Sequence, residues 1–455
     1  MKIVVAGSGR IGQYLITSLV DEGHDVVVID NSAEVISEIT SVCDVMGVCG
    51  HAADYETLES AGVKQAELYI AVTTSDETNM LSCFFAKRLG VHYAIARIRD
   101  PEISDESLSF MRKELGIDMV INPEALAARE LFNILKMPSA AKIESFSGRL
   151  LEIVELRIKD GSSLDGLTLK DLRIKHNARV LICTVQRGNE VYIPGGDFVL
   201  HAGDKIGITS TPAEIELFLK KFGLMQKKAK NIMILGGGRT AIYLSKMLIA
   251  GGSSVKIIEI NSEKAEELSE ALPKATILVG RGTQKSMLVE EGLGETDAFV
   301  ALTNQEERNI LMAMFADNLN VPKVIADVDQ TEMVDMAGKL GLDTIVSPKK
   351  VVTDVIIRYA RGLNNSLGTN VETLYKLMDD RIEALEFRVK QPIQNVTGIK
   401  LKDLKSKQGI LIAGIIRGKK TVVPGGEDMI QQGDRVVVLA KGHRLNDLTD
   451  IISAK

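Results

Sequence analysis

The chain has no tryptophan, only four cysteines among 455 residues, and no long hydrophobic run. A membrane-spanning helix needs about 20 consecutive apolar residues, whereas the apolar runs of this sequence have the length of strands. The cysteines form no Cys-x-x-Cys pair and have no histidine at ligand spacing, so we expect reduced, packed thiols and no bound metal. Because a strand pattern starts at Lys2, we expect no signal peptide and a cytoplasmic location.

Positive charge is not in excess either. The chain has 55 lysine and arginine residues against 61 aspartate and glutamate residues, which leaves a formal net charge of −6. A nucleic-acid-binding surface needs clustered positive charge, and anionic lipid headgroups repel an acidic chain. We therefore expect no nucleic-acid partner and no direct insertion into a membrane, so that any membrane association runs through a protein partner.

The sequence does contain one internal duplication of domain size. The segment Gly7–Gly12 matches Gly236–Ala241 at an offset of 229 residues (7 to 236). Later matches, at an offset of 230, pair Ala71–Asn79 with Ala301–Asn309, Pro194–Gly196 with Pro424–Gly426, and Gly203–Asp204 with Gly433–Asp434. A repeat of this length is a whole domain or more, far longer than a solenoid unit.

Each half begins with strands that alternate with helices. In the first half the apolar run Lys2–Ala6 precedes a glycine-rich turn, a helical stretch Ile11–Glu22 and a second strand, Asp25–Ile29. Further strands are predicted at Leu68–Val72, Ala94–Ile98 and Met119–Ile121. This alternation predicts an α/β fold with a Rossmann-like, doubly wound parallel sheet covered on both faces.

The second part of each half has a different pattern. Alternating apolar and polar residues at Leu156–Lys159 and Leu385–Lys390 predict half-exposed strands. Short helices are predicted at Leu169–Leu172 and Leu401–Leu404, strands at Val180–Gln186 and Leu411–Ile416, and a last strand after each Gly-Asp pair. This pattern predicts a small α+β domain in each half, with Met225–Lys230 as the linker between the halves.

The first glycine motif has the full context of a dinucleotide-binding turn. Gly7-x-Gly9-x-x-Gly12 follows a strand, opens a helix, and is followed by Asp30 at the end of the second strand. Phosphates bound there meet free N–H groups and the positive end of the helix. Asp30 is expected to bind the adenosine ribose and to disfavour NADP. A tight turn without a ligand is the alternative.

The second half keeps the motif with Ala241 in place of the third glycine and Glu259 in place of the aspartate. The two clefts are expected to differ in charge, because Arg97 at the end of a predicted strand is matched by Asp327. We therefore predict that the first cleft accepts the more highly charged nucleotide. A surface ion pair between Arg97 and Asp100 is the alternative role of this arginine.

Polar pairs follow the strand beside the glycine turn in each half, namely Thr73-Thr74 and Thr303-Asn304. Ligands of open α/β sheets bind at the carboxyl ends of strands near the topological switch point. We therefore expect these side chains to contact ribose or phosphate. Capping of the helices that follow is their alternative role.

Residues for nicotinamide-dependent chemistry are missing. None of the eight tyrosines has lysine four positions on, the pattern of short-chain dehydrogenases, and the six histidines are scattered. The sequence also has no Gly-x-Ser-x-Gly and no His-Glu-x-x-His motif. We therefore expect a ligand-binding protein and not an enzyme, with an NAD-dependent oxidoreductase as the alternative.

Together these motifs resemble the TrkA family, the peripheral subunits of Trk potassium-uptake systems, which are tandem pairs of RCK regulatory units. The resemblance covers nearly the whole chain and rests on the glycine motif with Asp30, on Val72–Asn79, on Ala96–Pro101 and on the two Pro-Gly-Gly turns. It implies RCK N-terminal domains at 1–122 and 231–347, crossover helices at 123–139 and 348–366, a linker at 225–230, and RCK C-terminal domains at 140–224 and 367–455.

The resemblance also implies a function and a set of binding residues. The function is that of a nucleotide-sensing cytoplasmic subunit, which binds NAD(H) or ATP/ADP and gates an integral-membrane potassium transporter from the inner face of the membrane. The implied cofactor-binding residues of the first half are Gly7, Ser8, Gly9, Arg10, Ile11, Gly12, Asp30, Thr73, Thr74, Arg97 and Ile98. Those of the second half are Gly236, Gly237, Gly238, Arg239, Thr240, Glu259, Arg281, Thr303 and Asn304. Related domains often have Gly-Asp-Ala after the third strand, where this chain has Gly50-His51-Ala52 and Gly280-Arg281-Gly282, so the nucleotide preference stays open.

Two apolar stripes bear on assembly. They consist of Leu126, Leu131, Ile134 and Leu135 in the helical stretch Glu124–Lys136, and of Val351, Val352, Val355, Ile356 and Tyr359 after Pro348. Such stripes pack within a chain or dock on a partner. The resemblance places crossover helices here and implies a dimer contact within a ring-like homo-oligomer. A soluble sensor of another small ligand, such as a cyclic dinucleotide between the C-terminal domains, is the remaining alternative.

Overall fold

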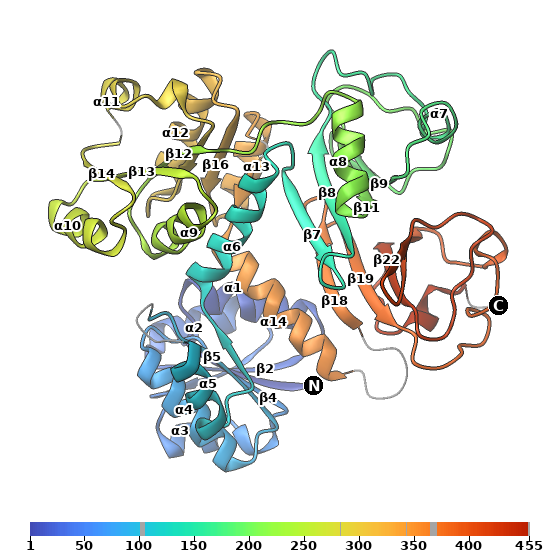
Figure 1. Ribbon diagram of the computed structural model, residues 1–455. Coiled ribbons are helices and arrows are strands. Elements are labelled where there is room, and N and C mark those ends of the chain that lie inside the picture. Colours follow the sequence, from blue (N-terminus) through green and yellow to red (C-terminus); the bar gives the residue numbers. More distant parts are fainter. Residues whose placement is uncertain (101–104, 283, 343, 365–370, 454–455) are drawn as a thin grey trace.

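The computed structural model describes residues 1–100, 105–282, 284–342, 344–364 and 371–453 (Figure 1). Pro101 and the expected domain boundary at 366/367 lie outside the described residues. Two six-stranded and two five-stranded sheets alternate along the described parts of the chain. No helix in these ranges is both long enough and apolar enough to cross a bilayer.

The first sheet is parallel, with the strand order β3-β2-β1-β4-β5-β6. The elements of this first Rossmann domain are β1 (Lys2–Ala6), α1 (Arg10–Asp21), β2 (Asp25–Asp30), α2 (Ala33–Val42), β3 (Met46–Cys49), α3 (Tyr55–Ser60), η1 (Val63–Gln65), β4 (Leu68–Ala71), α4 (Asp76–Leu89), β5 (Tyr93–Arg97), α5 (Asp105–Leu115) and β6 (Met119–Ile121). The central strands are almost continuously apolar because helices cover both faces of the sheet. The strand order reverses between β1 and β4, so the carboxyl ends of these two strands border the crevice where such sheets bind ligands.

The second Rossmann domain repeats this topology, with the order β14-β13-β12-β15-β16-β17. Its elements are β12 (Asn231–Leu235), α9 (Arg239–Ala250), β13 (Ser254–Glu259), α10 (Ser262–Ala271), β14 (Thr276–Val279), α11 (Lys285–Glu290), η2 (Leu293–Glu295), β15 (Ala298–Ala301), α12 (Glu306–Asn318), β16 (Lys323–Asp327), α13 (Thr331–Lys339) and β17 (Ile345–Val346). The expected α/β class with two doubly wound parallel sheets is therefore confirmed.

Each Rossmann domain is followed by an antiparallel five-stranded sheet, in the orders β10-β9-β11-β8-β7 and β18-β19-β22-β20-β21. The first C-terminal domain contains β7 (Lys142–Phe146), β8 (Leu151–Arg157), α7 (Leu169–Ile174), β9 (Leu181–Arg187), β10 (Glu190–Tyr192), β11 (Lys205–Ser210) and α8 (Pro212–Lys221). The second contains β18 (Val371–Leu377), β19 (Ile382–Arg388), η3 (Leu401–Asp403), β20 (Ile410–Arg417), β21 (Lys420–Val422), β22 (Arg435–Lys441) and η4 (Leu448–Ile451). The helix expected at Leu401–Leu404 is only a 3-10 turn, because three residues cannot close an α-helical turn.

The two C-terminal domains share a core. Apolar residues of the first, including Phe146 and Ile153, are buried in one cluster with Leu377 and Leu439 of the second. The ring of Phe146 meets Tyr375 edge-on, with 5.1 Å between the centroids. The two antiparallel sheets therefore pack against each other through apolar side chains within one chain.

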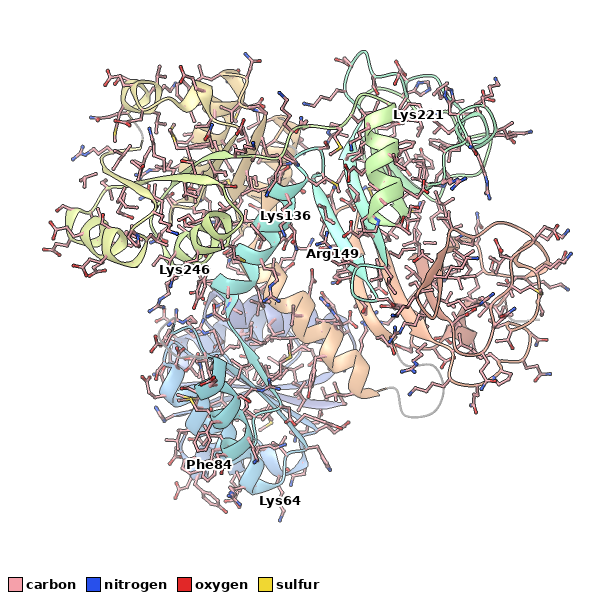
Figure 2. The ribbon with its side chains drawn as sticks, viewed as in Figure 1. Lys64, Phe84, Lys136, Arg149, Lys221 and Lys246 are labelled. Carbon is pink, nitrogen blue, oxygen red and sulfur yellow. The ribbon has the colours of Figure 1, made fainter. Side chains whose placement is uncertain are left out.

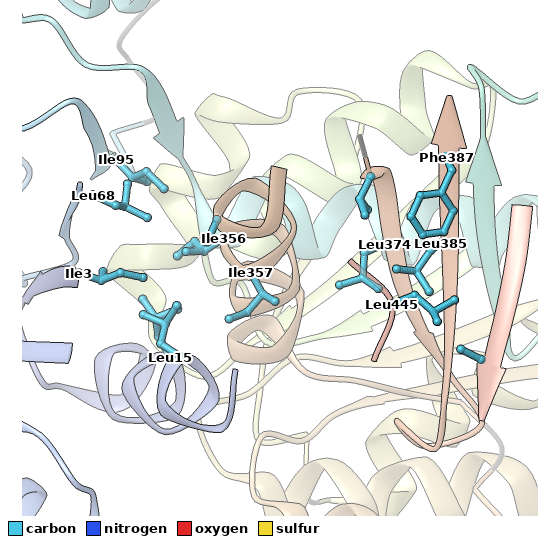
Figure 3. Close-up of a cluster of buried hydrophobic side chains, with 14 of the residues drawn as sticks. Ile3, Leu15, Leu68, Ile95, Ile356, Ile357, Leu374, Leu385, Phe387 and Leu445 are labelled. Carbon is cyan, nitrogen blue, oxygen red and sulfur yellow. The ribbon is translucent and has the colours of Figure 1, made fainter. Parts of the chain in front are cut away.

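The crossover helices are exchanged between the two Rossmann domains. Helix α6 (Pro123–Lys136) follows the first domain but packs against α9, and it buries Leu131, Ile134 and Leu135 in the core of the second. Helix α14 (Pro348–Asn364) follows the second domain but packs against α1, and it buries Val352 and Ile356 in the core of the first (Figure 3).

This exchange corrects the expected role of the apolar stripes. Their central residues are buried inside one chain, so they are not available to dock a partner chain. The physical reason is the tandem duplication, because a second Rossmann domain in the same chain offers each crossover helix its apolar surface.

Candidate functional site

The first glycine turn has the geometry of an anion-binding helix start. Gly7 has a φ of +99°, and a Cβ there would lie 2.8 Å from the backbone nitrogen of Thr73. A Cβ at Gly12 would lie 2.0 Å from the carbonyl oxygen of Gly7, so α1 can approach β1 this closely only without a side chain. A Cβ at Gly9 would meet no atom within 4 Å. Gly9 is the N-cap of α1 and has no capping side chain, which leaves the first N–H groups of the helix open to an anion.

The second turn repeats this geometry. Gly236 has a φ of +101°, and a Cβ there would lie 2.7 Å from the carbonyl oxygen of Leu302. Gly238 caps α9 without a side chain and also faces open space. Both halves therefore present bare amides at the start of a helix.

Asp30 ends β2 and lies against the first turn. One of its carboxylate oxygens accepts hydrogen bonds from the backbone N–H (2.8 Å) and the hydroxyl (2.9 Å) of Ser8. Its other oxygen accepts a hydrogen bond from the backbone N–H of Ser32 at 3.0 Å. The residue is half-buried, so the carboxylate both fixes the turn and borders the cleft.

Glu259 is more deeply placed, with only 6% of its surface exposed. Its carboxylate accepts hydrogen bonds from the backbone N–H groups of Gly237 and Ile260 at 2.8 Å and of Asn261 at 3.0 Å. Burial alone would raise the pKa of Glu259, but these N–H groups and nearby Lys264 lower it below its usual value. The side chain of glutamate is one methylene longer than that of aspartate, and the carboxylate of Glu259 lies beneath the second turn. Both of its oxygens already accept hydrogen bonds there.

An apolar rim beside Glu259 was not anticipated. Ile260 and Val279 are 58% and 57% exposed, and Val279 lies directly opposite Glu259 in the β13–β14 register. Arg281, also exposed, follows two residues later. In the first cleft the corresponding place beside the aspartate is held by Cys49. The sequence did contain a signal for this rim, because Ile260 is an apolar residue directly after Glu259, at a strand end where polar residues are expected. The sequence reasoning did not use it.

A buried asparagine organises the strand ends in each cleft. The Oδ1 of Asn79 accepts hydrogen bonds from the N–H (2.9 Å) and the hydroxyl (2.7 Å) of Thr73. Asn309 binds Thr303 in the same way, at 3.0 and 2.6 Å. Ser75, and not Thr73, is the N-cap of α4. The sequence reasoning missed both asparagines, although they end the two matched segments.

The other expected residues divide by exposure. Exposed at the turns and strand ends are Arg10, Thr74, Arg239 and Asn304, while Ile11 and Thr240 are half-buried. Ile98 is 2% exposed and belongs to the core of the first Rossmann domain. Its side chain therefore points away from the cleft, and only its backbone can reach a ligand.

Arg97 is a buried cation at the end of β5. It is 7% exposed, donates a hydrogen bond to the carbonyl oxygen of Thr73, and has a buried Nε without a hydrogen-bond partner among the described residues. Burial is the main cause that lowers its pKa, and repulsion from Arg99 adds to it. Arg239 of the second Rossmann domain repels the same guanidinium. The carboxylates of Glu124 and Asp76 act in the opposite direction and favour the charged guanidinium.

Asp327 occupies the matching place in the second cleft. Burial, together with repulsion from Asp329 and Glu306, raises its pKa to about 8. The raised pKa favours the neutral form of the acid that was expected as a carboxylate, because burial and the nearby carboxylates both disfavour its charge. The first cleft thus has a cation where the second cleft has an acid.

Residues beside the two clefts meet at the contact between the Rossmann domains. The side-chain amide of Asn122, at the end of β6, donates a hydrogen bond to the hydroxyl of Tyr243 on α9 at 3.0 Å. The repulsion between Arg97 and Arg239 acts across the same contact. Arg239 of the second Rossmann domain therefore lies near enough to act on the first cleft.

Comparison with known proteins gives consistent matches. The TrkA-N domain model matches residues 3–123 and 232–348, and the TrkA-C domain model matches 153–223 and 394–453. The chain is 32% identical to the Trk system potassium uptake protein TrkA homolog of Archaeoglobus fulgidus, over 99% of this chain and 100% of that protein. It is 30% identical to the Trk system potassium uptake protein TrkA of Vibrio alginolyticus, over 96% of this chain and 95% of that one.

Among solved structures, the GsuK RCK domain superposes with a TM-score of 0.64 at 18% identity, covering 97% of this chain and 92% of that one. The GsuK channel bound to NAD superposes with a TM-score of 0.63 at 17% identity, covering 97% and 77%. Fold and paired turns thus define a tandem RCK-type chain. The chain belongs to the TrkA family of Trk system potassium uptake proteins.

Proposed function

We propose that this protein is the nucleotide-sensing regulatory subunit of a potassium-uptake system, with NAD(H) and ATP or ADP as its ligands. The observation that carries this proposal is the pair of uncapped glycine turns, each with an acid against it. Uncapped N–H groups at a helix start bind phosphate, and the half-buried Asp30 borders the first cleft, where a ribose would lie. The names of the relatives above support the potassium system as the setting.

The two clefts take different nucleotides in this proposal. Arg97, whose buried Nε has no hydrogen-bond partner among the described residues, places a cation at the first cleft, which suits the longer phosphate chain of ATP. The second cleft has Asp327, with its raised pKa, in the matching place, together with the apolar rim of Ile260 and Val279. This cleft suits a less charged ligand with an adenine that covers apolar surface, such as NAD(H).

The nucleotide acts as a signal and not as a reactant in this proposal. None of the curated relatives named above carries an enzymatic name. Ligand binding between two domains shifts their arrangement only by its differential affinity for the two states, typically about 1–3 kcal/mol. Such a difference is enough for a ~5- to 150-fold change in a coupled equilibrium. The coupled element would be an integral-membrane potassium transporter, to which the subunit binds from the inner face of the membrane.

A second copy of the chain is the proposed partner for the outer faces of the Rossmann domains. Leu81 on α4 is 47% exposed, and its repeat counterpart Leu311 on α12 is 61% exposed. Neighbouring helices add Phe110 on α5, 67% exposed, and Leu340 at the end of α13, 51% exposed. Phe84, also on α4, lies on the outer side of the first Rossmann domain, away from α6 and α14 (Figure 2). The same apolar face in both halves suits repeated contacts in a ring.

Two measurements test this function. Mass spectrometry of the purified protein should identify bound adenine nucleotide, and calorimetry should show binding of NADH and ATP. Vesicles with the transporter should then respond differently to the two nucleotides. The absence of any heat with adenine nucleotides, or identical potassium flux with each, would refute the proposal.

A further inference from the structure

One cluster of charges, centred on a buried arginine, joins three parts of the fold. Arg361 on α14 is 5% exposed and contacts two carboxylates at once. Its Nε and Nη2 donate to Glu22 at 2.6 and 2.7 Å, and its Nη1 and Nη2 donate to Glu383 at 2.9 and 2.7 Å. Glu22 ends α1 of the first Rossmann domain, and Glu383 lies in β19 of the second C-terminal domain. Arg444, after β22, binds Glu22 as well, at 2.6 Å. We call these four residues the Arg361 node.

Helix α1 connects this node to the first glycine turn. The helix begins at Arg10, beside the open amides, and ends with Glu22 as its C-cap. Its twelve residues span about 18 Å as a rigid rod. The two arginines also lie at the negative end of the helix dipole, where cations are favoured. A displacement of the helix at its phosphate-binding end is therefore transmitted to Glu22.

The other half of the duplication has the same backbone, but its described residues form no such node. The counterpart of Glu22 is Gly251, the C-cap of α9, and the two have nearly the same conformation, with φ of −73° and −79°. The counterpart of Arg361 is Lys136, since Pro123 aligns with Pro348, and its amine lies over the ring of Phe132 at 4.2 Å.

The first C-terminal domain has a carboxylate in place of Glu383, but it is bound locally. Glu152 aligns with Glu383, since β8 and β19 pair in the same register with β11 and β22. Arg149, from the hairpin of the same domain, forms an ion pair with Glu152 at 3.0 Å. Among the described residues, the Arg361 node therefore has no equivalent between the second Rossmann domain, α6 and the first C-terminal domain.

We propose that the Arg361 node fastens the first Rossmann domain to the second C-terminal domain, so that ligand-driven movement of the first cleft, and not of the second, passes through α1 to the C-terminal pair. Buried charge-assisted bonds with two bidentate pairs are directional and costly to break singly. The node thus moves as one body. Among the described residues no matching ion-pair cluster joins the second Rossmann domain to the first C-terminal domain, where the buried Lys323 Nζ donates to the carbonyl oxygen of Ala140 at 2.6 Å. The part of this inference that concerns nucleotide rests on the proposed function.

Hydrogen–deuterium exchange on the full chain tests the node, first without nucleotide. Glu22→Gly introduces the residue that the other half has and leaves Arg361 paired with Glu383. We expect exchange to rise at least about tenfold both at 18–24 and in β19, because charged hydrogen bonds across the node are lost. Glu22→Gln, which keeps the side-chain volume, should give a smaller rise at the same two places.

Lys136→Met is the matched control, since it removes the aligned cation of the first half, and it should leave exchange in β8 unchanged. A rise at 18–24 alone in Glu22→Gly, with β19 unaffected, would overturn the clamp. So would an equal rise in β8 in the control variant.

The second arm adds ATP to the same samples. In the unsubstituted chain ATP should lower exchange in β19, and Glu22→Gly should abolish that change while ATP still protects the first glycine turn. Retention of the β19 response in Glu22→Gly would refute transmission through the node. If ATP and NADH bind nowhere, the proposed function fails, whereas the first arm still decides whether the clamp exists.

Discussion

Substitution of Gly9 by valine separates ligand binding from folding. Gly9 has φ of −68° and ψ of −169°, a conformation that valine adopts without strain. An added Cβ meets no atom of the described residues within 4 Å, so the side chain extends into the open cleft. The substitution therefore blocks the place where a phosphate approaches the turn and leaves the core unchanged.

The two effects of Gly9→Val differ in size. A non-glycine residue reduces the entropy of the unfolded chain and stabilises by about 0.4–1 kcal/mol. Loss of glycine at an N-cap costs a similar amount, so the melting temperature should hardly change. Each charge-assisted hydrogen bond to phosphate that is lost costs about 1.5–3 kcal/mol, or a ~10- to 100-fold weaker affinity.

Calorimetry and thermal melts on both variants provide the assay. Gly238→Val is the matched variant in the second cleft, because Gly238 also caps its helix in open space. Gly9→Val should weaken ATP and spare NADH, and Gly238→Val should do the reverse. An unchanged affinity for every nucleotide in a folded Gly9→Val protein would refute the reasoning that the ligand approaches at this turn.

Three further predictions follow from the charges and the exposed apolar residues. Arg97→Met should weaken the affinity for ATP ~10- to 100-fold. It should not lower the melting temperature of the free protein, because it removes a buried cation whose Nε has no hydrogen-bond partner among the described residues. An unchanged ATP affinity would contradict this role. The Asp327 carboxyl has its pKa raised from 3.8 to about 8, so the native state holds a proton that the unfolded chain releases at lower pH. The stability from this group is therefore full below 3.8, falls as pH rises toward 8, and is lost above 8. Asp327→Asn, which mimics the protonated acid, should gain melting temperature relative to the unsubstituted chain as pH rises from about 5 to about 8 and keep that gain near pH ~9, and parallel curves would exclude this titration. Leu81→Lys with Leu311→Lys should lower the mass in light scattering, while Leu217→Lys on α8, 58% exposed in the unsubstituted chain, should not; equal masses for all variants would place the assembly surface elsewhere.

The local elements could be predicted from the sequence because their signals are local. The strand Lys2–Ala6 and the helix after the first glycine turn follow from apolar periodicity and from the glycine spacing, and the structure places them within a residue of the prediction. Two edge strands were not predicted. Strand β3 has only four residues and none of them is fully buried, and β7 is buried only at its last residue, Phe146, so neither has an apolar run. Edge strands are held by backbone pairing with a neighbour, which leaves little trace in composition.

The candidate site could be predicted only in part. The glycine turns and the acids at the strand ends were visible as motifs, since the spacing itself produces the geometry. The internal engagement of Glu259 and the raised pKa of Asp327 were not visible, because both depend on which groups surround a buried carboxylate. The role of Asn79 was not visible either, because it depends on Thr73 and on the end of β5, which lie beside Asn79 only in the folded chain.

The sequence by itself determined that the chain is a duplication, that each half has a parallel and an antiparallel domain, and that two helix starts are open to phosphate. Only the tertiary structure decided that α6 and α14 exchange partners and that Arg361 links Glu22 to Glu383. An apolar stripe shows that a helix face is buried, but not against which surface, because burial free energy is proportional to area and has no direction. Contacts between residues 339 positions apart, such as that of Glu22 with Arg361, arise only when the whole chain has folded.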